Sequence, residues 1–216
     1  DGCDPEYTTN VLIEDCVFNT GDDAIAIKAG RDQDAWRIGQ KTANIVIRNC
    51  EFSSKCNGLC IGSEMAAGVE NVYMYDVHIG KCHSAIYFKS NLDRGGFIRN
   101  VWVNNINIDM VRTAFIHFEN NYHGGRGGNH PTSFSNFVIQ NVKGGESGQC
   151  GIYAVGVEGM PIRNVLVKNV SFDKTADKEY LIMHTEDFVF DNVTVAGNSL
   201  PYTPVPIEEY VKLKTD

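Results

Sequence analysis

The apolar residues of this chain alternate with polar ones in short segments, and the same pattern returns along most of its length. Each segment opens with asparagine or aspartate, continues with apolar residues at every second position, and carries another asparagine or aspartate five residues after the opening. Alternation at period two is typical of a β-strand with one buried face. The openings are Asn10, Asn44, Asn71, Asn100, Asn136, Asn164 and, in a degenerate copy, Asp187. This recurrence predicts a solenoid, in which one unit is stacked several times.

The stretches between these strands hold turn residues rather than a helical pattern. Parallel strands in a βαβ arrangement need a crossover helix, and none is visible. We therefore predict an all-β fold, a parallel β-helix of about seven coils over residues 1–200. Residues 201–206 (PYTPVP) cannot continue a strand ladder, because proline lacks the backbone donor. We expect residues 201–216 to form a C-terminal tail, and further coils to precede the uncapped N-terminal end.

A second polar position recurs at the same register in every copy. Asparagine and aspartate tolerate the left-handed backbone of a sharp corner. In stacked coils their side chains would also lie above one another and form a hydrogen-bonded ladder, although asparagine is common in any turn. The residues at this position are Asp15, Asn49, Asp76, Asn105, Asn141, Asn169 and Asn192.

Composition narrows the classes of partner. The 216 residues are 43% hydrophobic, enough for one ample core, and the net charge of -8 disfavours a nucleic-acid partner. No apolar run approaches the length of a membrane span, so we expect no membrane partner. None of the seven cysteines forms a CxxC pair, which disfavours a zinc site. Cys16 and Cys50 share one register and are expected to be buried free thiols.

Two adjacent acids, Asp22 and Asp23, follow Gly21 and begin an alternating apolar strand. Neighbours on a strand point to opposite faces, so both can share one cleft only if the chain bends, as Gly21 would allow. Asp1 occupies the matching place in the preceding coil. Glycoside hydrolysis needs one acid and one carboxylate, and repulsion could keep one of them protonated. A plain surface turn remains open, as does a Ca²⁺ site, although the spacing matches no known loop.

Together these residues resemble glycoside hydrolase family 28, the polygalacturonase-like pectin hydrolases, over essentially the whole chain. Asp1-Gly2 is similar to the end of the family's NTDG motif, and Gly21-Asp22-Asp23 matches its GDD. Lys89 falls at the lysine of RIK, and Tyr122 at the motif tyrosine. The stretch GDDAIAIKAGRD is most similar to exo-acting bacterial members. The resemblance implies the C-terminal portion of a right-handed parallel β-helix, secreted or periplasmic, with no metal or cofactor.

The resemblance also implies a role for each matching residue. Asp22 would be the general acid, while Asp1 and Asp23 would hold and deprotonate the attacking water, with inversion at the anomeric carbon. Lys89 would pair with a galacturonate carboxylate, and Tyr122 would line the sugar subsite. Two further substrate-binding candidates, cations near the cleft that no motif assigns, are Arg31 and Arg94.

The chain departs from the family pattern at two positions, which we also expect to contact substrate. Asn57 stands at the histidine of GHG, and Tyr87 stands at the arginine of RIK. Both changes put unbranched polygalacturonan in question, because family branches acting on rhamnogalacturonan or substituted pectin differ there too. His83 and His117 could substitute in space, although a lone histidine is more often structural.

The main hypothesis is an inverting, exo-acting hydrolase of pectic polysaccharide or oligosaccharide that contains galacturonic acid. Three alternatives stay open: a rhamnogalacturonan-directed hydrolase of the same family, a catalytically inactive carbohydrate-binding β-helix, and a pectate lyase. The lyase is the weakest, because that chemistry wants Ca²⁺ and an arginine base. Besides the glycan, a separate N-terminal part of the same protein is a candidate partner.

Overall fold

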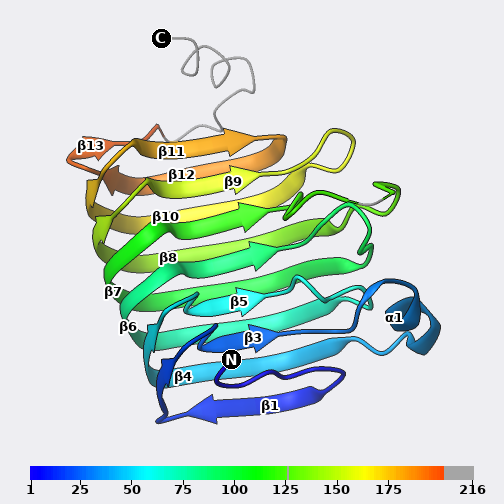
Figure 1. The fold of residues 1–216 in the computed structure, drawn as a ribbon. Helices are drawn as coiled ribbons and strands as arrows, with labels where there is room; N and C mark the ends of the chain where they lie inside the picture. Colours follow the sequence, from blue (N-terminus) through cyan, green and yellow to red (C-terminus); the bar gives the residue numbers. More distant parts are fainter. Residues whose placement is uncertain (126, 202–216) are drawn as a thin grey trace.

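The computed structural model describes residues 1–125 and 127–201, which wind into a right-handed parallel β-helix (Figure 1). Neighbouring coils pair in parallel, and only the last short strand is antiparallel. The strands are β1 Thr9–Glu14, β2 Val17–Thr20, β3 Ile25–Ile27, β4 Thr42–Ser54, β5 Leu59–Ile61, β6 Val69–Lys89, β7 Phe97–Glu119, β8 Ser133–Ser147, β9 Cys150–Val155, β10 Ile162–Thr175, β11 Lys178–Met183, β12 Thr185–Val195 and β13 Asn198–Ser199.

The strand register confirms that each repeated segment is one coil. The third residue of every copy pairs with the third residue of the next, through the series Leu12, Val46, Tyr73, Trp102, Val138, Leu166 and Val189. Seven stacked segments match the predicted number. Strands β6 and β7 are long because each continues around a corner onto the next face of the solenoid.

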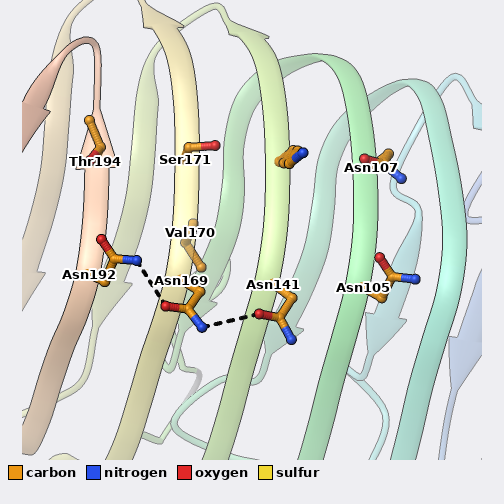
Figure 2. Close-up of a pocket in the computed structure, with 9 residues that line it drawn as sticks. Asn105, Asn107, Asn141, Asn169, Val170, Ser171, Asn192 and Thr194 are labelled. Carbon is orange, nitrogen blue, oxygen red and sulfur yellow. Dashed lines mark hydrogen bonds between the residues drawn. The ribbon is translucent and has the colours of Figure 1, made fainter.

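Left-handed backbone marks both polar positions of each repeat. All seven openings and all seven following positions have φ between 50° and 63°. The expected ladder is present along the second row, where Asn192, Asn169 and Asn141 are linked (Figure 2). A more regular ladder runs along the openings, with five successive side-chain hydrogen bonds from Asn164 down to Asn10. Asparagine therefore has two roles at these positions: its backbone adopts the left-handed conformation of the corner, and its side chain forms hydrogen bonds to the neighbouring coil.

The core is filled by columns of aliphatic and aromatic side chains. One column runs Ile25, Leu59, Ile86, Ile116 and Ile152, and every member is fully buried. A fully buried side chain of this kind contributes about 1.5–3 kcal/mol. Aromatic pairs extend the packing, as where Phe115 stacks on Phe172 at 4.2 Å between ring centroids. This rigid interior fixes the strands that carry the polar residues described next.

Two features outside the coils complete the picture. A seven-residue helix, α1 (Asp32–Ile38), lies beyond β3, where the sequence showed only loop character. The seven cysteines are all free, but Cys16 is only half-buried, whereas Cys50 is buried. No helix among the described residues is long and apolar enough to cross a membrane. Apart from Pro201, the expected C-terminal tail lies outside the described residues.

Candidate active site

The predicted acids lie on the face built from β3, β5, the end of β6 and the end of β7. The backbone bridge between Cys3 and Ile25 places Asp1 beside Asp23, and the N–H of Gly2 donates to the carbonyl of Asp23 at 2.9 Å. Asn57 precedes β5 in the same row. The stacked coils thus bring residues from distant parts of the sequence into one line.

A bend before β3 allows the two adjacent aspartates to differ in exposure. Asp22 is exposed, whereas Asp23 is 3% exposed. One carboxylate oxygen of each residue still lies within 4.8 Å of the other and of the Cys56 sulfur. Gly21 has room for a Cβ and an ordinary φ, so the bend does not depend on its lacking a side chain.

Asp23 is a buried carboxylate held from three directions. Its Oδ1 accepts hydrogen bonds from the backbone N–H of Asn57 at 3.0 Å and from the Asn57 side chain at 2.6 Å. Its Oδ2 lies 3.3 Å from the ammonium of Lys89. Burial alone would raise the pKa of Asp23, but Lys89 and the hydrogen bonds from Cys56 and Asn57 outweigh it and lower that pKa. Asp23 is therefore ionised at neutral pH.

Asp22 is also ionised at neutral pH. The N–H of Asp23 donates to Asp22 Oδ1 at 2.9 Å, and this bond lowers the pKa of Asp22 against the opposing effect of its partial burial. The idea that mutual repulsion holds one acid protonated near neutral pH is thus wrong for the structure as it stands. Hydrogen bonds and the nearby Lys89 charge stabilise both carboxylates more than the pair repels itself.

Asp1 shares the row but has a different partner. Its Oδ2 lies 2.9 Å from the ammonium of Lys28, which follows β3. The same ammonium is 3.6 Å from Asp4. The Asp1 carboxylate therefore borders the site, whereas those of Asp22 and Asp23 form its centre.

Tyr87, at the position of the expected arginine, is 4% exposed at the end of β6. Its hydroxyl donates to Glu119 Oε2, and its ring stacks on His117 at 4.0 Å. Burial, then the Glu119 charge, raises its pKa far above the ordinary value, so the phenol stays protonated. The missing guanidinium is thus replaced by a neutral donor that is already engaged with an acid.

The remaining candidates border a pocket of about 340 Å³. Its lining includes Tyr122, Arg31 and Arg94, and the Lys89 ammonium lies 5.2 Å from the Tyr122 ring centroid. The side chain of Arg31 is 56% exposed. In contrast, Arg94 is buried and holds loops together, with its Nε donating to the carbonyl of Ser63 and its Nη1 lying 2.6 Å from Asp32.

The two histidines proposed as substitutes, His83 and His117, form no hydrogen bond or ion pair with Asp22 or Asp23 among the residues that the structure describes. Thr113 Oγ1 lies 3.0 Å from Nε2 of the half-buried His83. His117 is 5% exposed, and its Nδ1 lies 3.0 Å from the hydroxyl of Ser84. Burial lowers the pKa of His117 to about 3, so the ring is neutral.

One grouping among the described residues could offer three metal ligands, namely Asp22, Asp23 and Cys56. Both oxygens of Asp23 already have protein partners, and burial together with Asp23 raises the pKa of the Cys56 thiol to about 12. A protonated thiol is a poor metal ligand. The arrangement therefore suits acid–base chemistry by the two carboxylates better than metal binding. That the reaction needs no metal stays a prediction.

Sequence reasoning did not single out Glu119 or Ser84. Ser84 is fully buried, and its N–H donates to Asn57 Oδ1 at 3.2 Å, which fixes the amide that holds Asp23. Aligning the internal repeats would have found Glu119. The stretch ending at Lys89 (IYFK) pairs residue by residue with the stretch ending at Glu119 (IHFE).

Comparison with known proteins gives one family and several relatives. The sequence profile of the glycosyl hydrolases family 28 matches residues 1–196. A probable polygalacturonase of Vitis vinifera is 29% identical over 213 residues, covering 95% of this chain and 41% of that protein. A polygalacturonase of Ralstonia nicotianae is 32% identical over 145 residues, covering 65% of this chain and 25% of that protein.

Solved structures agree as well. The hyperthermoactive exopolygalacturonase from Thermotoga maritima superposes with a TM-score of 0.85 and 28% identity, covering 91% of this chain and 44% of that one. The family 28 exopolygalacturonase of Yersinia enterocolitica, at 20% identity and a TM-score of 0.58, supports the fold alone. The chain belongs to glycosyl hydrolase family 28. It spans about two fifths of the length of the Vitis and Thermotoga proteins.

Proposed function

We propose that this chain carries the catalytic residues of a pectin hydrolase that cleaves glycosidic bonds next to galacturonic acid, inverts the anomeric carbon and acts from a chain end. The observation that carries the proposal is the pairing of exposed Asp22 with buried, Lys89-bound Asp23 on one face of the solenoid. The family relationship and the exopolygalacturonase from Thermotoga maritima support it. Because pectic polymers are too large to enter a cell intact, we also propose a secreted or periplasmic enzyme.

The division of roles follows from exposure and hydrogen bonding. Asp22, the exposed acid, would donate a proton to the glycosidic oxygen as the bond to the anomeric carbon breaks. Each carboxylate oxygen has about two lone-pair positions, and Asp23 Oδ2, 3.3 Å from the Lys89 ammonium, would use one of them to accept a hydrogen bond from a water molecule. Asp23, with Asp1 alongside, would take a proton from that water as its oxygen attacks the anomeric carbon.

Inversion rests on the family relationship rather than on carboxylate spacing. Inverting glycosidases usually keep their carboxyl groups about 6.5–9.5 Å apart, whereas oxygens of Asp22 and Asp23 lie within 4.8 Å. The anomer that first appears in the product, followed by proton NMR during hydrolysis of a galacturonic acid oligomer, tests the stereochemistry. Net retention would contradict inversion. Release of single sugars from a labelled oligomer, rather than a spread of lengths, would support action at the chain end.

Because the pKa of Asp22 is lowered, the pH dependence of kcat/KM tests directly whether Asp22 is the general acid. A general acid must carry its proton in the free enzyme, and kcat/KM reports the pKa values of the free enzyme. Hydrogen bonding from the Asp23 N–H holds the pKa of Asp22 below its ordinary value. We therefore expect kcat/KM to fall as pH rises, and we expect the fall to begin below the ordinary aspartate pKa.

Asp22→Asn is the decisive substitution. We expect it to lower the release of reducing ends from pectic oligosaccharides by roughly 100- to 10,000-fold, the contribution typical of a positioned acid. Asp15→Asn is the matched control, because the same change there introduces the residue that other coils carry at the ladder position. Circular dichroism checks that both variants fold.

Three results would count against the proposal. They are activity of Asp22→Asn close to that of the unaltered chain, absence of any hydrolysis by the unaltered chain, and products that absorb in the ultraviolet. The last would indicate elimination rather than hydrolysis. Glycan binding without turnover would instead favour the carbohydrate-binding alternative.

A further inference from the structure

Along the outward surface of this face, which we call the floor, the charge changes sign one coil beyond Lys89. The outward residues at this register are Lys89 in β6, Glu119 in β7, Val155 in β9 and Met183 in β11. Neighbouring strands lie about 4.8 Å apart. A sugar chain that lies along the stacked coils would therefore pass from a cationic position directly to an anionic one, and then to apolar positions.

Glu119 presents a carboxylate to this floor. Its side chain is 26% exposed, and its Oε2 accepts the hydrogen bond from the hydroxyl of Tyr87. The hydroxyl is neutral, because the buried phenol keeps its proton. This contact therefore orients the carboxylate without cancelling its charge.

No cation among the described residues neutralises Glu119. Its nearest ring nitrogen is Nε2 of His117, at 3.8 Å, and that imidazole is neutral because burial lowers its pKa to about 3. The ammonium of Lys89 is bound to Asp23 and lies 5.5 Å from the ring centroid of Tyr87. No ion pair within 4.0 Å joins Lys89 to Glu119 among residues 1–125 and 127–201. A second carboxylate placed here would meet an uncompensated like charge in a partly desolvated site.

We propose that Glu119 is a specificity-determining residue that excludes a uronate from the position above Tyr87 and accepts a neutral sugar there. The inference rests on the proposed hydrolase function and narrows its substrate class. The substrate would be a pectic chain in which galacturonate, bound at Lys89, is followed by a neutral sugar. A run of consecutive galacturonates would be a poor substrate.

Hydrogen bonding supports the same assignment. A carboxylate is an acceptor only, and its two oxygens offer about four lone-pair positions. Tyr87 uses one of them. The remaining positions suit the hydroxyl groups of a neutral sugar, which donate hydrogen bonds, whereas a uronate carboxylate has no proton to donate. Charge and hydrogen-bond polarity therefore select against the same ligand.

A purely structural role for Glu119, as the anchor of the Tyr87 hydroxyl, is the main rival explanation. Glu119→Gln separates the two, because the amide oxygen still accepts from Tyr87 while the negative charge is lost. Glu146→Gln is the matched control. It removes one negative charge from an exposed residue on another face of the solenoid, where Glu146 is paired with Lys174.

The experiment compares two oligosaccharides of equal length, one of consecutive galacturonates and one of galacturonate alternating with rhamnose. The unaltered chain should give the higher kcat/KM with the alternating substrate. Glu119→Gln should shift the ratio of the two kcat/KM values toward the galacturonate oligomer by at least about tenfold, a change of about 1.4 kcal/mol. Glu146→Gln should leave that ratio unchanged.

The outcomes separate this inference from the function on which it rests. Hydrolysis of consecutive galacturonates at least as fast as the alternating substrate would overturn the inference and leave the hydrolase function standing. An unchanged ratio in a folded Glu119→Gln variant would also overturn it. Failure of the unaltered chain to hydrolyse either substrate would overturn the proposed function itself, and the inference with it.

Discussion

The burial of the ion pair between Lys89 and Asp23 allows a quantitative prediction about the free energy of unfolding. The side chains are 11% and 4% exposed, with the ammonium 3.3 Å from Asp23 Oδ2. At that separation the direct attraction is about 5 kcal/mol for an effective dielectric constant of about 20. Both charges lose hydration on burial, so the pair as a whole contributes less than this. Removing one member leaves the other buried and unpaired, which is the costly case.

Lys89→Met should therefore lower the free energy of unfolding at pH 7 by about 3–5 kcal/mol. The double variant Lys89→Met, Asp23→Asn should recover part of this loss, because no buried charge remains. Urea unfolding followed by circular dichroism gives both values from the midpoint and slope. Lys174→Met breaks the exposed pair with Glu146 and should leave the midpoint where it is.

The pH dependence supplies an independent check. In the unaltered chain the pKa of Asp23 is lowered, so its contribution is present above the ordinary aspartate pKa of about 3.9 and is lost as pH falls through the folded value. The raised pKa of Lys89 makes its contribution fully present below about 10.4 and lost at higher pH. Loss of Lys89 would raise the pKa of Asp23 relative to that in the unaltered chain, because only the hydrogen bonds from Cys56 and Asn57 would then oppose the effect of burial. Protonation of Asp23 would relieve the variant. The destabilisation should therefore shrink between pH 7 and pH 4.

The reasoning fails if Lys89→Met costs less than about 1 kcal/mol at pH 7, the size of an exposed ion pair. It also fails if the cost is the same at pH 7 and pH 4, or if the double variant is less stable than Lys89→Met alone. Each of these results would mean that the two charges are not buried together in solution.

Two further substitutions test the surroundings of this pair. Asn57→Ala removes one hydrogen bond to the Asp23 carboxylate and leaves a buried backbone donor without its acceptor, so it should cost about 2–5 kcal/mol; urea midpoints measure this, and a cost equal to that of the exposed control Asn107→Ala would contradict it. His117→Phe should flatten the fall in stability between pH 6.5 and pH 3, because the folded pKa of about 3 lies below the unfolded value of 6.5 and only the unfolded chain gains a proton in that interval. A slope of stability against pH equal to that of the unaltered chain would refute this.

Much of the fold follows from the repeat. The spacing of the asparagines predicts the coils, and the period-two alternation predicts which residues face inward. Placing Asp1 one coil before Asp23 is a matter of repeat register, and the backbone bridge at Cys3 agrees with it. The helix α1 is outside this logic, because it belongs to a loop that no other coil repeats.

Sequence alone could not predict how each polar side chain is engaged. Arg94 reads as a cation near a cleft, but its burial and its contacts with Ser63 and Asp32 depend on three loops meeting. Asp22 and Asp23 read as mutually repelling acids, yet both are ionised. The N–H between them and the ammonium of Lys89, 66 residues away, decide their pKa values.

The amino-acid sequence by itself determined that the polypeptide winds into stacked coils. Asparagine corners recur at regular intervals, and the alternating apolar side chains between them are buried together when the coils stack. Only the assembled solenoid decided which acids carry charge and which cations are occupied. Those properties depend on desolvation and on neighbours a full rung apart, and neither exists before the rungs are in contact.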